Sequence, residues 1–315
     1  MRQAVLILGM HRSGTSAIAG ASHLLGAAAP ATMLEPAADN PTGFWESETI
    51  AGLNEAILDA GGCTWFDSLA FDPANVSANY RHDLLPYSTS TLTHEFGDAP
   101  LFVLKDPRFS LVLDLWLPTF AAMNINVAPL LALRHPAEVM ASLRRREQMP
   151  GGIAAPLWLH YMLEAERNTR DRPRAVLSYD RIMQDWRGCL TRIAAGSGIA
   201  WRVPFESAAP AIGEFLRPTL RHHYATPSKA AAGKPPIANW IAETYDALRR
   251  IELGDGTAQF ARLDRVHAQF ATWRARAPRV TAADATGQLP GPISSTPPTT
   301  SPSPAASPGR NVAFR

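Results

Sequence analysis

The residues best suited to chemistry form a glycine-containing loop near the start of the chain. An apolar run, Ala4–Leu8, is typical of a buried strand and stops at Gly9, and after a polar turn Gly14-Thr15-Ser16 opens a helical pattern. This order brings backbone N–H groups together at the positive end of a helix dipole, which suits a bound phosphate. The two glycines fit the P-loop frame, but Thr15 stands where an NTP-hydrolysing loop has Lys, and the cation is instead Arg12. The loop therefore predicts a phosphate site, but not one for the phosphates of a metal-bound ATP.

The segment Arg12-Ser13-Gly14-Thr15-Ser16 resembles the 5′-phosphosulfate loop, (K/R)-S-G-T-(T/S), of sulfotransferases that use 3′-phosphoadenosine 5′-phosphosulfate (PAPS). The wider GMHRSGTS stretch is similar to the opening of bacterial members of that family. Their second signature is an Arg at a strand end with a Ser eight residues later, and Arg134 and Ser142 have this spacing. The resemblance covers about residues 5–223 and implies an α/β three-layer sandwich with a central parallel sheet, P-loop NTPase-like.

The resemblance also implies how the nucleotide is held. Arg134 and Ser142 would hold the 3′-phosphate, and Tyr179, in LSYDRIMQDW, would approach the adenine. The Arg-Lys-Gly loop that closes this site in cytosolic members is absent, and Arg221 is the candidate to replace it. The loop residues that would bind the 5′-phosphosulfate are His11, Arg12, Ser13, Gly14, Thr15 and Ser16.

Sulfuryl transfer also needs a cation for the charge that grows on the leaving phosphate oxygen. Arg12 is the first candidate, although Arg, with a pKa above about 12, stabilises that charge without donating a proton. Lys105, in LKDPR, is the second, because it ends an apolar run and resembles the Lys-Asp-Pro of tyrosylprotein sulfotransferases. The alternative for Lys105 is a structural ion pair with Asp106 and Arg108.

The acceptor must lose a proton, and Glu46 is the candidate base. The stretch from Asn40 to Glu46 resembles N-P-x-G-(F/Y)-(W/F)-E of the bacterial proteins. Burial beside Phe44 and Trp45 would raise the pKa of this carboxyl towards neutrality. The alternative is an acid at a helix start. Many cytosolic sulfotransferases use a His as the base, which makes His11 the second candidate.

Alternating strand and helix patterns must position these residues. Each apolar run is followed by a polar turn and a helical pattern, which predicts a parallel sheet with ligands at the carboxyl ends of its strands. Residues 27–97 are richer in Pro and Gly, and loops with short helices are expected there as the acceptor wall. Further helices are expected at Pro150–Arg170 and, as a pair, within Ala238–Arg276. The four strand–helix pairs are Ala4–Leu8 with Thr15–Leu25, Leu101–Leu104 with Ser110–Phe120, Val127–Leu133 with Pro136–Gln148, and Ala175–Ser178 with Asp180–Ala195.

Composition limits the number of domains and the classes of function that the chain can have. The chain has 315 residues, 46% of them hydrophobic, which predicts one domain over residues 1–277, followed by a disordered Pro/Ser/Thr-rich tail over residues 278–315. A formal net charge of +2 argues against a nonspecific nucleic-acid binder. Cys63 and Cys189 lack metal-ligand spacing, so reduced structural thiols and no metal are expected. No membrane span or signal peptide is expected, and cytoplasm is the predicted location.

These observations favour a PAPS-dependent sulfotransferase that moves a sulfuryl group to a hydroxyl, or an amine, and releases adenosine 3′,5′-bisphosphate. The partners expected are this nucleotide and an acceptor whose identity stays open; no partner protein is predicted. The second hypothesis is a P-loop nucleotide kinase, against which Thr15 argues. A nucleotide-binding protein without catalysis is the third, favoured only if Glu46 and Lys105 face away from the loop.

Overall fold

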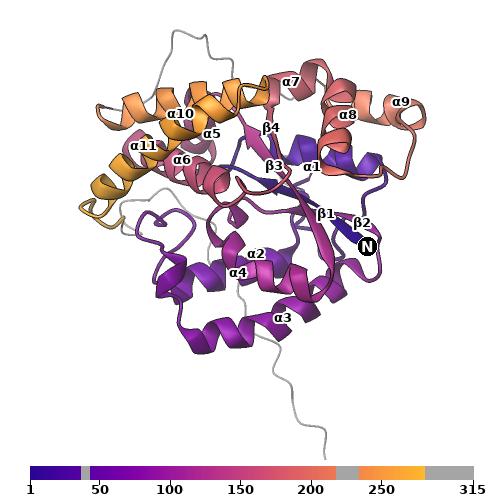
Figure 1. Ribbon diagram of the computed structural model, residues 1–315, viewed down its shortest axis with the longest axis horizontal. Coiled ribbons are helices and arrows are strands. Elements are labelled where there is room, and N and C mark those ends of the chain that lie inside the picture. Colours follow the sequence, from indigo (N-terminus) through magenta and orange to yellow (C-terminus); the bar gives the residue numbers. More distant parts are fainter. Residues whose placement is uncertain (37–42, 218–233, 281–315) are drawn as a thin grey trace, which may run out of the picture.

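A parallel sheet of four strands lies at the centre of the molecule (Figure 1). The computed structural model describes residues 1–36, 43–217 and 234–280. The strands β1 (Arg2–Leu8), β2 (Leu101–Lys105), β3 (Ile125–Leu133) and β4 (Ala175–Ser178) lie in the order β2-β1-β3-β4. All three neighbouring pairs are parallel. The predicted strands are confirmed, and β1, which leads into the glycine loop, is an inner strand.

The sheet is buried on both faces, which explains the unbroken apolar run of β1. Ala4, Leu6 and Leu8 pack into one core, while Val5 and Ile7 pack into the other. The two helical layers lie on opposite sides of the sheet in Figure 1. The three-layer α/β sandwich is therefore confirmed. The Val5 side is covered by α1 (Thr15–Leu24), α7 (Tyr179–Gln184), α8 (Trp186–Ser197) and α9 (Phe205–Phe215), and the Leu6 side by α2 (Glu48–Ala60), α3 (Ala78–Phe96), α4 (Phe109–Ala122), α5 (Pro136–Glu147), α6 (Gly151–Arg167), α10 (Ile237–Glu252) and α11 (Thr257–Arg274).

Residues 27–97 are more regular than the sequence predicts. They hold α2 and α3, of 13 and 19 residues, besides the short 3₁₀ helix η1 (Pro73–Asn75). Ser47 caps α2, because its Oγ accepts a hydrogen bond of 2.9 Å from the Ile50 N–H. Pro86 is accommodated inside α3. The expectation of short helices was wrong here because most of the Pro and Gly residues lie in the segments that flank α2 and α3, and only Gly52 and Pro86 lie inside them.

The predicted helix Asp180–Ala195 is two helices. The backbone of Asp185 leaves helical geometry (φ −144°, ψ 67°), and its carboxylate accepts a 2.8 Å hydrogen bond from the Gly188 N–H at the start of α8. The expected helix after Pro150 is confirmed as α6, with Trp158 and Tyr161 buried. Across the described ranges, no helix is both long and apolar enough to cross a membrane.

A buried polar cluster fixes α11 against α6 and gives the protein a predicted acid sensitivity. Arg274 donates a hydrogen bond of 3.0 Å to Nδ1 of His160, and burial lowers the pKa of that imidazole to about 3. The unfolded chain binds this proton with a pKa near 6.5, so stability is intact above pH 6.5 and falls as the pH drops below it. We expect the free energy of unfolding, measured with urea, to fall by about 2 kcal/mol between pH 7 and pH 5 through this group.

His160→Gln keeps an acceptor for Arg274 and removes the titration, so it should abolish that share of the pH dependence. The exposed His82, changed to Gln, is the matched control. An unchanged pH dependence in His160→Gln would contradict the prediction.

Candidate functional site

The loop between β1 and α1 has the backbone geometry of an anion cradle. Gly9 has φ 121°, and a Cβ placed there would lie 2.5 Å from the carbonyl oxygen of Ala132 on β3. Gly14, with φ 88°, is the N-cap of α1 and provides no side chain to cap it. The first N–H groups of a helix have no acceptor within the helix, so the start of α1 is available for an anion.

Two polar side-chain atoms of the loop are buried without a hydrogen-bond partner among the described residues. They are the Oγ of Ser13 and the Nε2 of His11. A buried polar atom without a partner costs about 1–3 kcal/mol, and a ligand that supplies the partner removes the cost. The loop therefore has two buried polar atoms that a bound ligand would satisfy.

The two sequence signatures meet at Arg12. This residue has a left-handed backbone (φ 69°), and its Nε donates a hydrogen bond of 2.9 Å to Oγ of Ser142 on α5. Arg134, just after β3, donates from Nη1 to the Arg12 carbonyl oxygen at 3.3 Å. The guanidinium carbon of Arg134 lies 4.7 Å above the ring of Tyr179, and that ring packs so closely on Gly14 that a Cβ there would approach it to 2.4 Å. Contacts between the anion loop, the end of β3, α5 and α7 thus bring together the predicted nucleotide residues Arg12, Gly14, Arg134, Ser142 and Tyr179.

Sequence reasoning missed one member of this group, Glu138. Its carboxylate accepts a hydrogen bond of 2.9 Å from Nε of Arg134, across one turn at the start of α5. The i,i+4 spacing of Arg134 and Glu138 was the available signal. Glu138 holds the guanidinium plane of Arg134 beside the loop.

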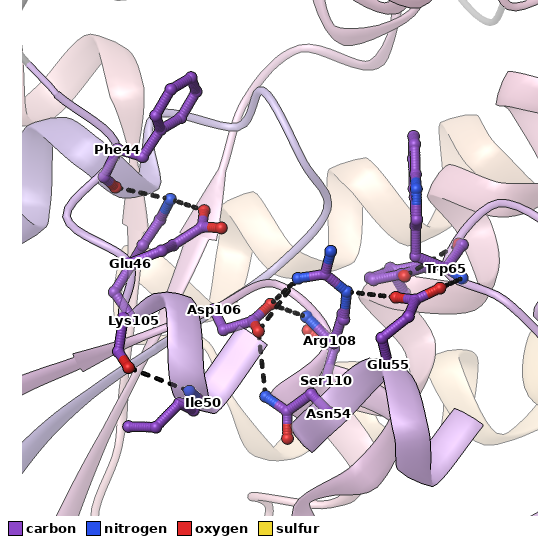
Figure 2. Close-up of polar contacts among 12 residues, drawn as sticks. Phe44, Glu46, Ile50, Asn54, Glu55, Trp65, Lys105, Asp106, Arg108 and Ser110 are labelled. Carbon is purple, nitrogen blue, oxygen red and sulfur yellow. Dashed lines mark hydrogen bonds and ion pairs between the residues drawn. The ribbon is translucent and has the colours of Figure 1, made fainter. Parts of the chain in front are cut away.

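Lys105 and Glu46 form a buried ion pair at the carboxyl end of β2 (Figure 2). Their exposed fractions are 5% and 7%. Lys105 Nζ also donates to the carbonyl oxygen of Phe44 at 2.9 Å, and the same oxygen accepts from Ser16 Oγ at 3.2 Å. Lys105 and Glu46 therefore lie beside the start of α1. Glu46 lies directly before Ser47, the N-cap of α2, which is the position that the helix-start alternative gives it, and it also pairs with Lys105.

The alternative in which Lys105, Asp106 and Arg108 pair with one another holds for only two of the three. Arg108 Nη1 donates to Asp106 Oδ1 at 3.0 Å, and its Nε donates to Glu55 at 2.7 Å, as Figure 2 shows. Burial opposes the charge of Arg108, but Asp106 and Glu55 outweigh it and raise the pKa of the guanidinium. Asn54 donates a further 3.0 Å hydrogen bond to Asp106. This network is therefore structural, and Lys105 pairs with Glu46 instead.

His11 lies against an aromatic wall. The centre of its ring is 4.6 Å from that of Trp65 and 5.6 Å from that of Tyr161. Burial, followed by the charges of Arg108, Lys105, Arg146 and Arg12, holds the pKa of His11 well below its usual range. The imidazole is therefore neutral at physiological pH.

Arg146 is a further residue that the sequence did not single out. Its guanidinium carbon lies 4.8 Å above the ring of Phe44, whereas its neighbours Arg144 and Arg145 are exposed. The three arginines are consecutive in the sequence, and only their different directions around the axis of α5 decide which one faces the site. Arg221 and the stretch from Asn40 to Thr42 lie outside the described residues.

Comparison with known proteins gives little sequence similarity. No protein-family model and no curated protein matches the chain. Among solved structures, the chain is similar to a sulfotransferase domain from the olefin synthase of Synechococcus PCC 7002. The two share 17% sequence identity over 78% of this chain and 94% of that domain, with a TM-score of 0.47.

Proposed function

We propose that the protein is a PAPS-dependent sulfotransferase that transfers a sulfuryl group to a hydroxyl or amine acceptor. The observation that carries the proposal is the contact of the two signatures: Ser142 accepts from Arg12, and Arg134 donates to the Arg12 carbonyl. Residues far apart in the chain thus form one cationic surface that joins the anion loop to β3 and α5.

The two ends of this surface support one orientation of the proposed donor. The loop and the start of α1 receive the 5′-phosphosulfate, with Ser13 Oγ supplying a donor that has no other partner among the described residues. Arg134 and Ser142 receive the 3′-phosphate, and Tyr179 contacts the adenine. Arg221 would complete the 3′-phosphate site.

The chemistry is assigned to the charged residues beside the loop. The acceptor oxygen attacks sulfur, the bond from sulfur to the bridging oxygen breaks, and the electron pair stays on the released adenosine 3′,5′-bisphosphate. Arg12 and Lys105 stabilise that charge. When Lys105 turns to the bridging oxygen it leaves Glu46, and the freed carboxylate takes the acceptor proton. The buried ion pair thus keeps base and cation together until the donor arrives.

The other two hypotheses are less well supported. A kinase would lack the loop Lys, because Thr15 stands in its place; turnover of ATP with magnesium would reveal one. A binding protein without catalysis required Glu46 and Lys105 to face away from the loop, but Lys105 shares the Phe44 carbonyl with Ser16 of α1.

The 3′-phosphate assignment predicts a large selectivity between nucleotides. Adenosine 3′,5′-bisphosphate should bind about 30- to 1000-fold more tightly than AMP, because the charge-assisted contacts to one phosphate contribute roughly 2–4 kcal/mol. Isothermal titration calorimetry of both nucleotides measures this ratio directly.

Arg134→Ala should remove most of the selectivity, because the bisphosphate loses a direct contact whereas AMP is affected only through Arg12 and Tyr179, which Arg134 contacts. Arg145→Ala, an exposed change on α5, the helix that follows Arg134, is the matched control. Equal affinities of the wild type for the two nucleotides would reject the 3′-phosphate site.

A further inference from the structure

The loop of residues 61–67, which follows α2, joins the site to a distant part of the chain. Its Trp65 packs on His11 of the anion loop, and the Trp65 carbonyl accepts a hydrogen bond of 3.0 Å from the Tyr161 hydroxyl on α6. The Trp65 N–H donates to Glu55 at 3.2 Å, and Glu55 also binds Arg108. Any shift of loop 61–67 therefore moves a ring that touches the anion loop.

Residues that follow α11 hold this loop from its outer side. Arg279 Nη2 donates to the Gly62 carbonyl oxygen at 2.6 Å, and Nη1 donates to the Cys63 sulfur at 3.2 Å. The Arg279 guanidinium lies 3.9 Å from the Asp67 carboxylate, which also accepts a 3.1 Å hydrogen bond from the Val280 N–H. Both ends of loop 61–67 are therefore held by residues that lie more than 200 positions later in the sequence.

Loop 61–67 contacts the anion loop at His11, whereas the proposed nucleotide residues Arg134 and Ser142 contact it at Arg12, so under the proposed function the acceptor is assigned to the His11 side. Trp65 lies against His11, and a chain of contacts through Glu55 and Arg108 leads from Trp65 to Asp106, the residue that follows Lys105 (Figure 2). Trp65 is half-buried.

We propose that Arg279 is a positioning residue for the acceptor site: by holding loop 61–67 it fixes Trp65 as the acceptor wall beside the anion loop. This inference rests on the proposed function. A guanidinium suits the role because its planar fork reaches the Gly62 carbonyl and the Cys63 sulfur together, whereas a Lys ammonium is a single point.

The test uses full-length Arg279→Ala, Arg279→Lys and the wild type. Hydrogen exchange measured by mass spectrometry should show the amides of loop 61–67 exchanging about tenfold faster in Arg279→Ala, because its anchoring contacts are lost. With an acceptor found by screening with labelled PAPS, the acceptor KM should rise about tenfold, while kcat and the affinity for adenosine 3′,5′-bisphosphate stay within about threefold. Arg279→Lys should recover part of the change in KM. The exposed Arg276, changed to Ala, is the matched control.

The outcomes separate this inference from the proposed function. If the wild type transfers sulfuryl but Arg279→Ala keeps the wild-type acceptor KM, or keeps slow exchange in loop 61–67, the positioning role is rejected and the sulfotransferase assignment stands. If the wild type neither binds the bisphosphate nor transfers sulfuryl, the proposed function is rejected, and the acceptor role with it. Hydrogen exchange in Arg279→Ala would then report only whether the loop is held.

Discussion

Changing Glu46 to Gln should slow sulfuryl transfer by about 10²–10⁴, the usual effect of removing a general base. The amide keeps the shape of the side chain, and its oxygen still accepts the hydrogen bond from Lys105; because the charge that pairs with Lys105 is lost together with the basicity, thermal unfolding of the variant must accompany the kinetics. The affinity for adenosine 3′,5′-bisphosphate should change less than about threefold, or 0.7 kcal/mol, because the base acts on the acceptor and not on the nucleotide. Single-turnover transfer from labelled PAPS and calorimetry measure the two quantities.

A matched control is Glu243→Gln, which removes a carboxylate of α10 that pairs with Arg265 on α11, among the helices of the C-terminal part. Its transfer rate should equal that of the wild type. If Glu46→Gln kept full activity, Glu46 would only hold Lys105. His11, neutral and in contact with the acceptor wall, would then be the residue to test as the base.

Loss of Lys105 should lower the rate of the chemical step by about 10²–10³, the effect of removing one donor that stabilises growing charge. Lys105→Gln is the better variant than Lys105→Ala, because it leaves a polar side chain to face the carboxylate. Breaking a buried ion pair from one side destabilises a protein by about 3–5 kcal/mol, so thermal unfolding of each variant must accompany the kinetics.

The double variant Glu46→Gln with Lys105→Gln tests whether the pair works as one unit. The double variant replaces the ion pair with a neutral hydrogen-bonded pair. It should therefore be more stable than Lys105→Gln alone, but it should not recover activity. If both residues serve the same step, the double variant should be about as slow as the slower single variant, instead of showing the product of both losses. A single-turnover rate for Lys105→Gln within a few-fold of wild type would reject its catalytic role.

The sequence by itself determined the local features of this protein. The run Ala4–Leu8 predicted a buried strand, and the glycine-containing turn that follows it predicted a phosphate loop. Strand–turn–helix repeats then required a parallel sheet, and a parallel sheet gathers the carboxyl ends of its strands at one edge. That is why the order of elements along the chain was enough to place Arg12, Lys105 and Arg134 near one another.

Tertiary structure alone decided which of these charges are partners. Lys105 has Asp106 as its neighbour in sequence, yet successive side chains at a strand end point to opposite faces, so Asp106 turns to Arg108 while Lys105 reaches Glu46. The contact of Arg12 with Ser142 spans 130 residues and depends on how α5 packs beside the sheet. The contacts of Arg279 with loop 61–67 also join residues far apart in the sequence. Such pairings are set by packing between elements, which no pattern within one element records.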